Sequence, residues 1–307
     1  MNLNSIERIQ QLKQEHRAII LVHNYQLGEV QDIADFTGDS LELSRIAAES
    51  SAEVIVFCGV HFMAETASIL CPDKKVLLPD LAAGCAMADM VTVDELQKAK
   101  DMHPDAPVVC YVNSTAEIKA LSYVCCTSAN AVDIVNNIDS EEVLFVPDQN
   151  LGKYVAMKTG KQVIFWSGYC PAHVRIKTDD VIRCKHDYPD APVVVHPECT
   201  PQVIALADEV LSTGGMVHYA ARDDVKEMIV GTEIGMLYRL KKGNPGKRFI
   251  PVSEQAVCAD MKLITLEKVL ASLEKMAPEV KVPEDIRRKA KTAVDRMLEV
   301  KRGGAGD

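Results

Sequence analysis

The sequence repeats itself three times along its 307 residues, and an internal period of this kind dictates architecture before any other feature does. Each copy begins with an apolar run that ends in a ring residue: His23, Tyr111 and His196. A hydroxyl residue follows each ring residue after seventeen positions: Ser40, Ser128 and Thr213. About thirty positions after the ring residue, a Glu opens a second apolar run. Three copies in one register predict three equivalent lobes.

One cysteine closes each copy, at Cys85, Cys170 and Cys258. All three follow a short predicted strand, so they occupy equivalent loops. Three lobes arranged around one axis would bring the three thiols to one place. Three thiolates without a fourth protein ligand predict a metal centre with one open position. In Gly168-Tyr169-Cys170-Pro171, the Cys-Pro step is typical of residues beside iron–sulfur clusters.

Each copy has the pattern strand, helix, strand, helix, strand. Its strands are continuous Val, Ile and Leu runs, which are typical of parallel sheets covered on both faces. We predict an α/β fold of three pseudo-threefold-related α/β/α lobes, with short parallel sheets around a central cluster site. The predicted lobes are residues 1–90 with an N-terminal helix, 91–175, and 176–307 with a C-terminal helix at 283–302. The Gly303-Gly304-Ala305-Gly306 end is expected to fray.

The predicted strands are 18–23, 53–58 and 75–78, then 107–112, 142–146 and 162–166, then 192–196, 226–230 and 248–252. The predicted helices are 38–50, 61–70, 93–103, 129–137, 149–159, 178–188, 213–221 and 233–242.

Composition limits the compartment and the partners. The polar N-terminus lacks the pattern of a signal peptide and there is no run of about 18 apolar residues, so we expect a cytoplasmic protein. Ten cysteines in that compartment favour metal, redox or catalytic roles over disulfides. The net charge of −10 argues against general binding to nucleic acid or membrane surfaces.

Zinc is the competing metal, but structural zinc sites use four ligands with local Cys-x2-4-Cys pairs, which the chain lacks. Cys125 and Cys126 are adjacent and would point to opposite faces of a strand. The cysteines that break the repeat are interpreted as core or surface residues, with Cys199 the least secure because it follows Glu198: Cys58, Cys71, Cys110, Cys184 and Cys199.

The ring residues lie at strand ends, where open parallel sheets bind their ligands. Alternation along the chain places three pairs on one face: His23 with Tyr25, Tyr111 with Asn113, and His196 with Glu198. Together they predict a pocket of two imidazoles, two phenols, an amide and a carboxylate, contributed by three lobes.

The hydroxyl residues lie where helices are expected to begin. A Ser or Thr there is most often an ordinary N-cap. A helix start also offers free amide groups to an anion, so Ser40, Ser128 and Thr213 are alternatively predicted to hold phosphate or carboxylate. A dinucleotide fingerprint and a Walker A motif are both absent from the sequence.

The chain resembles the quinolinate synthase family over nearly its whole length. The matching motifs, in order, are His23-Asn24-Tyr25-Gln26, Gly38-Asp39-Ser40-Leu41, Tyr111-Val112-Asn113-Ser114, Gly168-Tyr169-Cys170-Pro171-Ala172-His173, His196-Pro197-Glu198-Cys199, Ser212-Thr213-Gly214 and Gly231-Thr232-Glu233. The resemblance implies three pseudo-symmetric lobes around a 4Fe-4S cluster held by Cys85, Cys170 and Cys258, with one iron left open. The chain is similar to the compact form of the family, which lacks an added Cys-x-x-Cys tail.

The resemblance also implies a reaction, a transfer with a dehydration step in de novo NAD biosynthesis. Iminoaspartate and dihydroxyacetone phosphate condense to quinolinate with loss of phosphate and two waters. Catalytic roles would fall to Tyr25, Tyr111, His196 and Glu198, with Glu198 as base and Tyr25 as acid or base. The expected substrate-binding residues are His23, Ser40, Tyr111, Asn113, Ser128, His196, Glu198 and Thr213. His173 is expected to support the site rather than to bind metal.

Three alternatives remain open at this point. An aconitase-like hydratase could use the same open iron on a hydroxy-dicarboxylate. A cluster-bearing redox sensor would need no array of polar strand ends, and a structural zinc protein would be colourless. The reaction also implies a functional link to an aspartate oxidase or dehydrogenase that supplies iminoaspartate.

Overall fold

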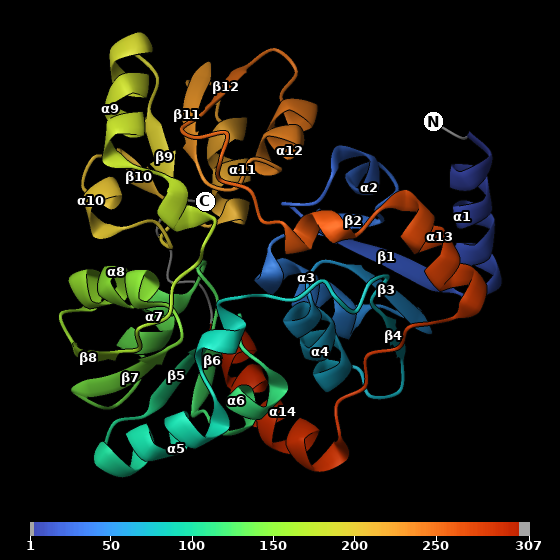
Figure 1. Ribbon diagram of the computed structural model, residues 1–307, viewed down its shortest axis with the longest axis horizontal. Helices are drawn as coiled ribbons and strands as arrows, with labels where there is room; N and C mark the ends of the chain where they lie inside the picture. The colour runs from blue at the N-terminus through green and yellow to red at the C-terminus, as the bar shows by residue number, and fades with distance from the viewer. Residues whose placement is uncertain (1–2, 301–307) are drawn as a thin grey trace.

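The computed structural model describes residues 3–300 and contains three four-stranded parallel sheets, each flanked by helices. Figure 1 shows the three sheets as separate lobes, with the first in blue, the second in green and the third in yellow to orange. The prediction of three α/β lobes is therefore confirmed. Residues 1–2 and 301–307, including the end that was expected to fray, lie outside the described residues.

The sheet of the first lobe has the strand order β2-β1-β3-β4. Its elements are α1 (Leu3–Glu15), β1 (Ala18–His23), α2 (Gly28–Asp32), β2 (Phe36–Gly38), α3 (Ser40–Glu49), β3 (Val54–Cys58), α4 (His61–Leu70) and β4 (Lys75–Leu77). Every residue of β3 is buried, as expected for a strand covered on both faces. A capping box fixes the start of α3, because Asp39 accepts the amide of Glu42 while Glu42 accepts the amide of Asp39.

The sheet of the second lobe has the equivalent order β6-β5-β7-β8. Its elements are α5 (Val93–Met102), β5 (Val108–Tyr111), α6 (Ala116–Ala120), β6 (Val124–Cys126), α7 (Ala131–Asn136), β7 (Glu142–Val146), α8 (Gln149–Thr159) and β8 (Gln162–Phe165). Asp148 caps α8 by accepting the amides of Asn150 and Leu151.

The sheet of the third lobe has the order β10-β9-β11-β12, so all three sheets share one topology. Its elements are α9 (Thr178–Asp187), β9 (Val193–Val195), α10 (Pro201–Ile204), β10 (Glu209–Val210), α11 (Thr213–Ala221), β11 (Glu227–Gly231), α12 (Met236–Gly243) and β12 (Arg248–Pro251). Since the topology repeats, equivalent residues of the three lobes lie at equivalent places relative to their own sheets.

Each lobe has one strand and one short helix that the sequence did not reveal. The strands β2, β6 and β10 lie at the sheet edges beside β1, β5 and β9. They contain only two or three residues, too few to produce an apolar run.

The C-terminal segment returns to the first two lobes. Helix α13 (Leu266–Lys275) packs against α1 and β3, and α14 (Glu284–Glu299) packs against α6, β6 and α4 (Figure 1). The buried stripe of α14 consists of Ala290, Ala293, Val294 and Met297. The C-terminal helix thus crosses a lobe boundary, and the proposed division of the chain into lobes stays a prediction.

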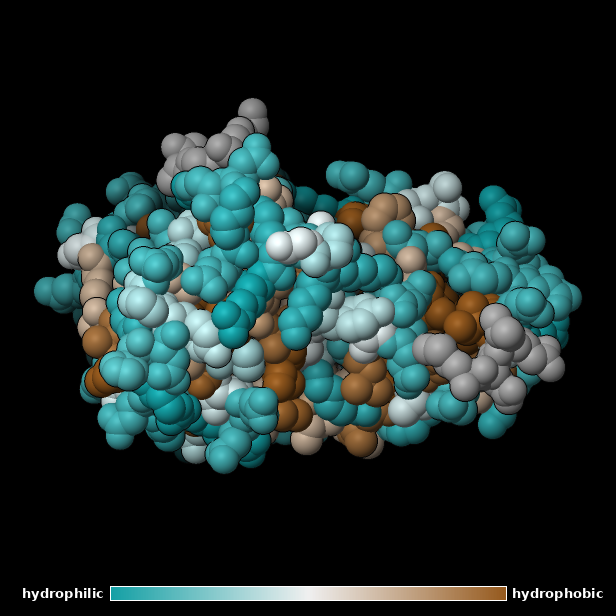
Figure 2. Space-filling model, turned by 90° about the horizontal axis from the view of Figure 1, so that it is seen from above, coloured by the Kyte–Doolittle hydropathy of each residue, from teal (hydrophilic) through white to brown (hydrophobic). Residues whose placement is uncertain are grey.

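The face of the molecule seen in Figure 2 is mainly polar. Figure 2 shows hydrophilic side chains over most of one face, with small apolar areas between them. Within residues 3–300, no helix combines the length and the apolar character needed to cross a bilayer.

Candidate active site

The structure brings every site residue predicted from the sequence to one cavity between the three lobes. The predicted residues that line it are His23, Tyr25, Ser40, Cys85, Tyr111, Asn113, Ser128, Cys170, His196, Glu198, Thr213 and Cys258. The cavity lies where the C-terminal ends of β1, β5 and β9 meet, because parallel strands direct these ends to the same side of each lobe.

A short 3-10 turn follows each of the three cysteines. These turns are η1 (Ala88–Met90), η2 (His173–Arg175) and η3 (Asp260–Leu263). In each copy, the amide of the third residue after the cysteine makes a hydrogen bond that favours the thiolate; these residues are Ala88, His173 and Met261. The repeat therefore extends to the backbone that surrounds each sulfur.

The chemistry of these thiols fits a metal centre. Burial raises the pKa of the Cys85 thiol to about 12 and that of Cys170 well above its usual value. Burial also raises the pKa of Cys258. The Cys85 pKa is also raised by Cys258, and the Cys170 pKa by Cys85, so the three thiols act on one another across the cavity. Burial opposes loss of the thiol proton, whereas the backbone amides favour the thiolate, which is the form that binds metal.

The two histidines at strand ends are held in the same way. The amide of Tyr25 donates to Nδ1 of His23 at 3.2 Å, and the amide of Glu198 donates to Nδ1 of His196 at 3.3 Å. Burial lowers the pKa of both rings to about 3, so both are neutral at pH 7. With Nδ1 accepting, each ring carries its proton on Nε2, and His196 Nε2 lies 3.1 Å from the Ser128 hydroxyl.

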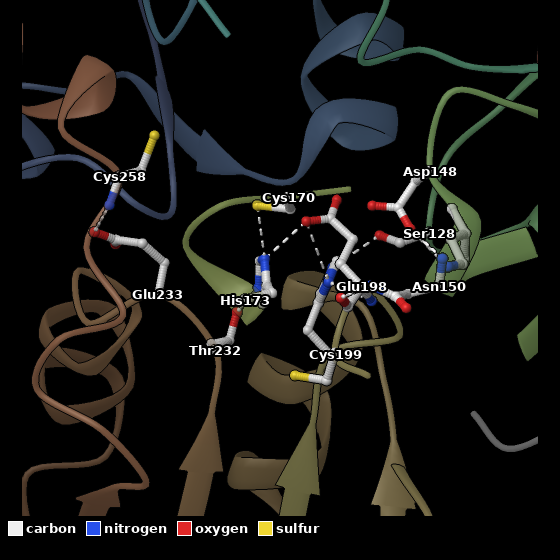
Figure 3. A network of polar contacts seen from close by, with 12 residues as sticks. Ser128, Asp148, Asn150, Cys170, His173, Glu198, Cys199, Thr232, Glu233 and Cys258 are labelled. Carbon is white, nitrogen blue, oxygen red and sulfur yellow. Dashed lines mark hydrogen bonds and ion pairs between the residues drawn. The ribbon is translucent and has the colours of Figure 1, made fainter. Parts of the chain in front are cut away.

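Glu198 is the charged centre of the site (Figure 3). Its Oε2 lies 2.7 Å from Nδ1 of His173, and its Oε1 accepts a 2.5 Å hydrogen bond from the Tyr111 hydroxyl. Burial alone would raise the pKa of Glu198, but His173, His196 and the hydrogen bonds from His173 and Tyr111 outweigh it and hold the pKa well below its usual value. Glu198 is therefore an ionised carboxylate.

Tyr25 is linked to the same network through a threonine. Its hydroxyl lies 2.6 Å from Oγ1 of Thr232, which in turn lies 2.8 Å from Nε2 of His173. Burial, with the negative charge of Glu198 as the next cause, raises the pKa of both Tyr25 and Tyr111 well above the usual value. Both phenols keep their protons at neutral pH and can act as donors.

The three hydroxyl residues do not serve as the caps of their helices. Asp39 and Ser212 cap α3 and α11, so Ser40 and Thr213 are the first helical residues instead. Thr213 accepts a hydrogen bond of 3.0 Å from Asn24 of the first lobe. Ser128 lies two residues before Asn130, which precedes α7. The N-cap alternative for these residues is wrong, while their predicted contact with substrate stays a prediction.

Asn113 supplies a polar atom to the cavity that needs a ligand. Its Oδ1 is buried and has no hydrogen-bond partner within the described part of the chain. Buried amide oxygens are almost always hydrogen-bonded in folded proteins. This atom is therefore available to accept a hydrogen bond from a molecule in the cavity.

Buried charged residues in and next to the wall of the cavity were not among the predicted site residues. Glu233 is fully buried, accepts the amides of Cys258 and Gly235 at 3.1 and 2.7 Å, and forms an ion pair of 2.9 Å with Lys262. Lys262 also donates to the backbone carbonyl of Tyr25. Asp148 is a further buried carboxyl group, and burial together with the charge of Glu198 raises its pKa well above the usual value. The motif Gly231-Thr232-Glu233 contains Glu233, but nothing in the sequence singled out Lys262.

The other cysteines do not line the cavity. Cys199, the least secure of these assignments, is fully buried, and its thiol donates at 3.5 Å to the carbonyl of Gly231. The interpretation of Cys199 as a core residue agrees with this position.

Comparison with known proteins identifies the relatives of this chain. A family model described as "Quinolinate synthetase A protein" matches residues 7–299. A protein of Dehalococcoides mccartyi (strain CBDB1) named "Quinolinate synthase" is 66% identical, over 95% of this chain and 97% of its own length. Proteins with the same name from Geotalea uraniireducens and Methanosarcina barkeri are 59% and 55% identical, each over 96% of this chain and 97% of its own length.

Proposed function

Because this chain belongs to the quinolinate synthetase A family, we propose that it condenses iminoaspartate with dihydroxyacetone phosphate to form quinolinate, with loss of phosphate and two waters. The product would supply the pyridine ring in NAD biosynthesis. The observation that carries the proposal is the convergence of equivalent cysteines, ring residues and hydroxyl residues from three lobes on one cavity. The cytoplasmic location and the link to an iminoaspartate-producing oxidase or dehydrogenase are parts of the same proposal.

Cys85, Cys170 and Cys258 would hold a 4Fe-4S cluster. These residues come from equivalent turns, and each sulfur has a backbone amide directed at it. When bound, the cluster would supply a Lewis-acidic iron that polarises a substrate oxygen.

The neutral donors of the cavity would bind the anionic groups of the substrates. His23 and His196 present Nε2–H groups, while Ser40, Ser128 and Thr213 present hydroxyls. Hydrogen bonds to carboxylate or phosphate oxygens are about twice as strong as bonds between neutral groups. Neutral donors can therefore hold both substrates without adding positive charge next to Glu198.

Proton transfer would fall to Glu198 and the two tyrosines. Glu198 is ionised and can accept a proton, and the Tyr111 hydroxyl at 2.5 Å fixes its orientation. Tyr25 retains its proton and can donate to a departing hydroxyl group. His196 orients Ser128 and contacts the backbone of Glu198, so it would position both groups.

Iminoaspartate hydrolyses in water, so the reaction needs a closed site. We propose that the lobes pivot and that Tyr25 and Tyr111 meet over bound substrate. Crystals with and without a substrate analogue test this motion, and identical lobe orientations in the two would contradict it.

The central experiment is anaerobic purification followed by iron and sulfide counting and by assay of quinolinate. We expect a brown protein with about four irons per chain that forms quinolinate only when a triose phosphate is present. Cys170→Ser should lose the cluster. Cys184→Ser, which replaces a thiol outside the cavity, is the matched control and should keep it.

The same experiment separates the alternative functions. An aconitase-like hydratase would act on a hydroxy-dicarboxylate without a triose phosphate. A redox sensor would hold the cluster and form no product. Full iron content and full activity in Cys170→Ser would contradict the ligand assignment itself.

A further inference from the structure

Three potential metal ligands lie together beside the predicted cluster position: the Cys170 thiol, His173 Nδ1 and a carboxylate oxygen of Glu198 (Figure 3). Nδ1 of His173 is 3.1 Å from Sγ of Cys170 and 2.7 Å from Oε2 of Glu198. All three ligand atoms lie within 4.8 Å of one another. The side chains of His173 and Glu198 are 1% and 4% exposed, so water competes little for these positions.

The residues behind these ligands hold them in orientation. Thr232 contacts Nε2 of His173 at 2.8 Å, which turns Nδ1 of the ring toward Cys170 and Glu198. Tyr111 occupies Oε1 of Glu198, which leaves Oε2 for the ligand group. Metal-binding histidines and carboxylates in proteins are held by hydrogen bonds of this kind to their other polar atoms.

The size of the group fits one ion rather than a cluster. Zinc binds sulfur at about 2.3 Å, and nitrogen and oxygen at about 2.0–2.2 Å, so its ligand atoms must lie within about 4 Å of one another. Small rotations of three side chains that already touch would satisfy this requirement. Among the described residues, the group whose ligand atoms all lie within 4.8 Å of one another includes Cys170 but neither Cys85 nor Cys258.

Charge balance also favours a divalent ion. A Cys170 thiolate and the Glu198 carboxylate carry two negative charges, and Zn²⁺ cancels both. A neutral assembly avoids the cost of an unpaired buried charge. Binding would release the thiol proton of Cys170. The His173 ring would carry its proton on Nε2, and this N–H would donate a hydrogen bond to the Thr232 hydroxyl oxygen.

We propose that a chain without its cluster binds a single Zn²⁺ through Cys170, His173 and Glu198, with the fourth position open to the cavity. Because Cys170 is also a predicted cluster ligand, the ion and the cluster exclude each other. Zinc would then hold the chain in a form that cannot accept iron and sulfide. The exclusion rests on the proposed cluster, whereas the zinc site rests on the three ligands alone.

Titration of the full-length, cluster-free chain with Co²⁺ tests the site. We expect one ion per chain and a charge-transfer band with the intensity of one thiolate. Cys170→Ser should abolish the band, and His173→Gln should weaken binding at least about 100-fold, more than the loss of an orienting contact would. Cys85→Ser and Cys258→Ser are the matched controls and should bind Co²⁺ as the unmodified chain does. Thermal unfolding of each metal-free variant checks that it folds.

A band with the intensity of three thiolates, or its loss in Cys85→Ser, would overturn the proposal. So would the absence of binding in the unmodified chain. Exclusion is tested by cluster reconstitution, followed by absorbance rather than activity. One equivalent of Zn²⁺ should block reconstitution of the unmodified chain but not of His173→Gln, which retains all three cysteines. Equal blocking in both would show that zinc acts elsewhere.

Discussion

At the scale of single residues, His23 and His196 differ from ordinary histidines because the fold keeps them neutral. Each Nδ1 accepts a hydrogen bond from a backbone amide, and burial lowers the pKa of each ring to about 3. An unfolded chain would bind protons at these rings below pH 6.5, but the folded chain would not. The free energy of unfolding that these two rings contribute is therefore complete above pH 6.5 and is lost as the pH falls toward 3.

We predict that the cluster-free chain loses about 1 kcal/mol per ring between pH 7 and pH 5.5, because the unfolded state gains a proton that the folded state excludes. Urea unfolding at the two pH values measures this loss. His23→Gln keeps an acceptor for the Tyr25 amide but cannot titrate. The variant should therefore lose about 1 kcal/mol less stability than the unmodified chain between the two pH values. An unchanged pH dependence in this variant would show that other groups titrate.

Thr232 shows how one hydroxyl can position two site residues. We predict that Thr232→Val lowers kcat about fivefold, because it removes a contact that aligns the Tyr25 hydroxyl with His173, and a hydrogen bond contributes roughly 1 kcal/mol. Thr232→Ser retains the hydroxyl and should restore most of kcat. Iron content should be the same in both variants. Wild-type kcat in Thr232→Val would contradict the positioning role.

The position of most site residues could be predicted because the repeat marks them three times. His173 could not be placed in this way, since the equivalent third residues after the other cysteines are Ala88 and Met261. Lys262 likewise has no pattern around it that marks a partner in another lobe. A residue with a role in only one copy gives no periodic signal, so its contacts appear only in the folded structure.

At the scale of helices and strands, long apolar runs were predicted well and short edge strands were not. Strand β7 (Glu142–Val146) and helix α8 (Gln149–Thr159) have the predicted bounds. In contrast, β10 consists only of Glu209 and Val210 and forms by pairing with β9. Pairing of this kind depends on the neighbouring strand rather than on local sequence.

The packing of α14 gives a prediction about stability. Met297 is fully buried on this helix, which packs against α6 and β6. We predict that Met297→Ala destabilises the protein by about 2–4 kcal/mol, because it leaves a cavity between two lobes. Chemical denaturation measures the loss. The exposed Lys289→Ala on the same helix is the control and should change stability by less than about 0.5 kcal/mol.

At the scale of the whole molecule, lobe contacts hold the site together. The first and third lobes are joined by Asn24 with Thr213, by Tyr25 with Thr232, and by Lys262 with the carbonyl of Tyr25. Gly235 permits the last contact, since a Cβ there would lie 2.5 Å from that carbonyl oxygen. The cysteine turn of the third lobe and the backbone at Tyr25 are therefore joined through Glu233 and Lys262.

We predict that Lys262→Met destabilises the protein by about 2–3 kcal/mol, because it leaves Glu233 buried without its cation. Thermal unfolding measures the loss, and hydrogen exchange should become faster around Tyr25. The double variant Lys262→Met, Glu233→Gln removes both charges and should recover part of the stability. A double variant no more stable than Lys262→Met would mean that the ion pair is not the cause.

The shared topology of the three sheets has one consequence for the molecules that enter between them. A cavity lined by three identical lobes would offer a ligand three equivalent orientations. Tyr111 replaces an imidazole at one of the three strand ends and directs its hydroxyl to Glu198, so that side differs from the other two. The residues two positions further on, Tyr25, Asn113 and Glu198, also differ, so the three sides of the cavity are chemically distinct and can select one orientation of an unsymmetrical ligand.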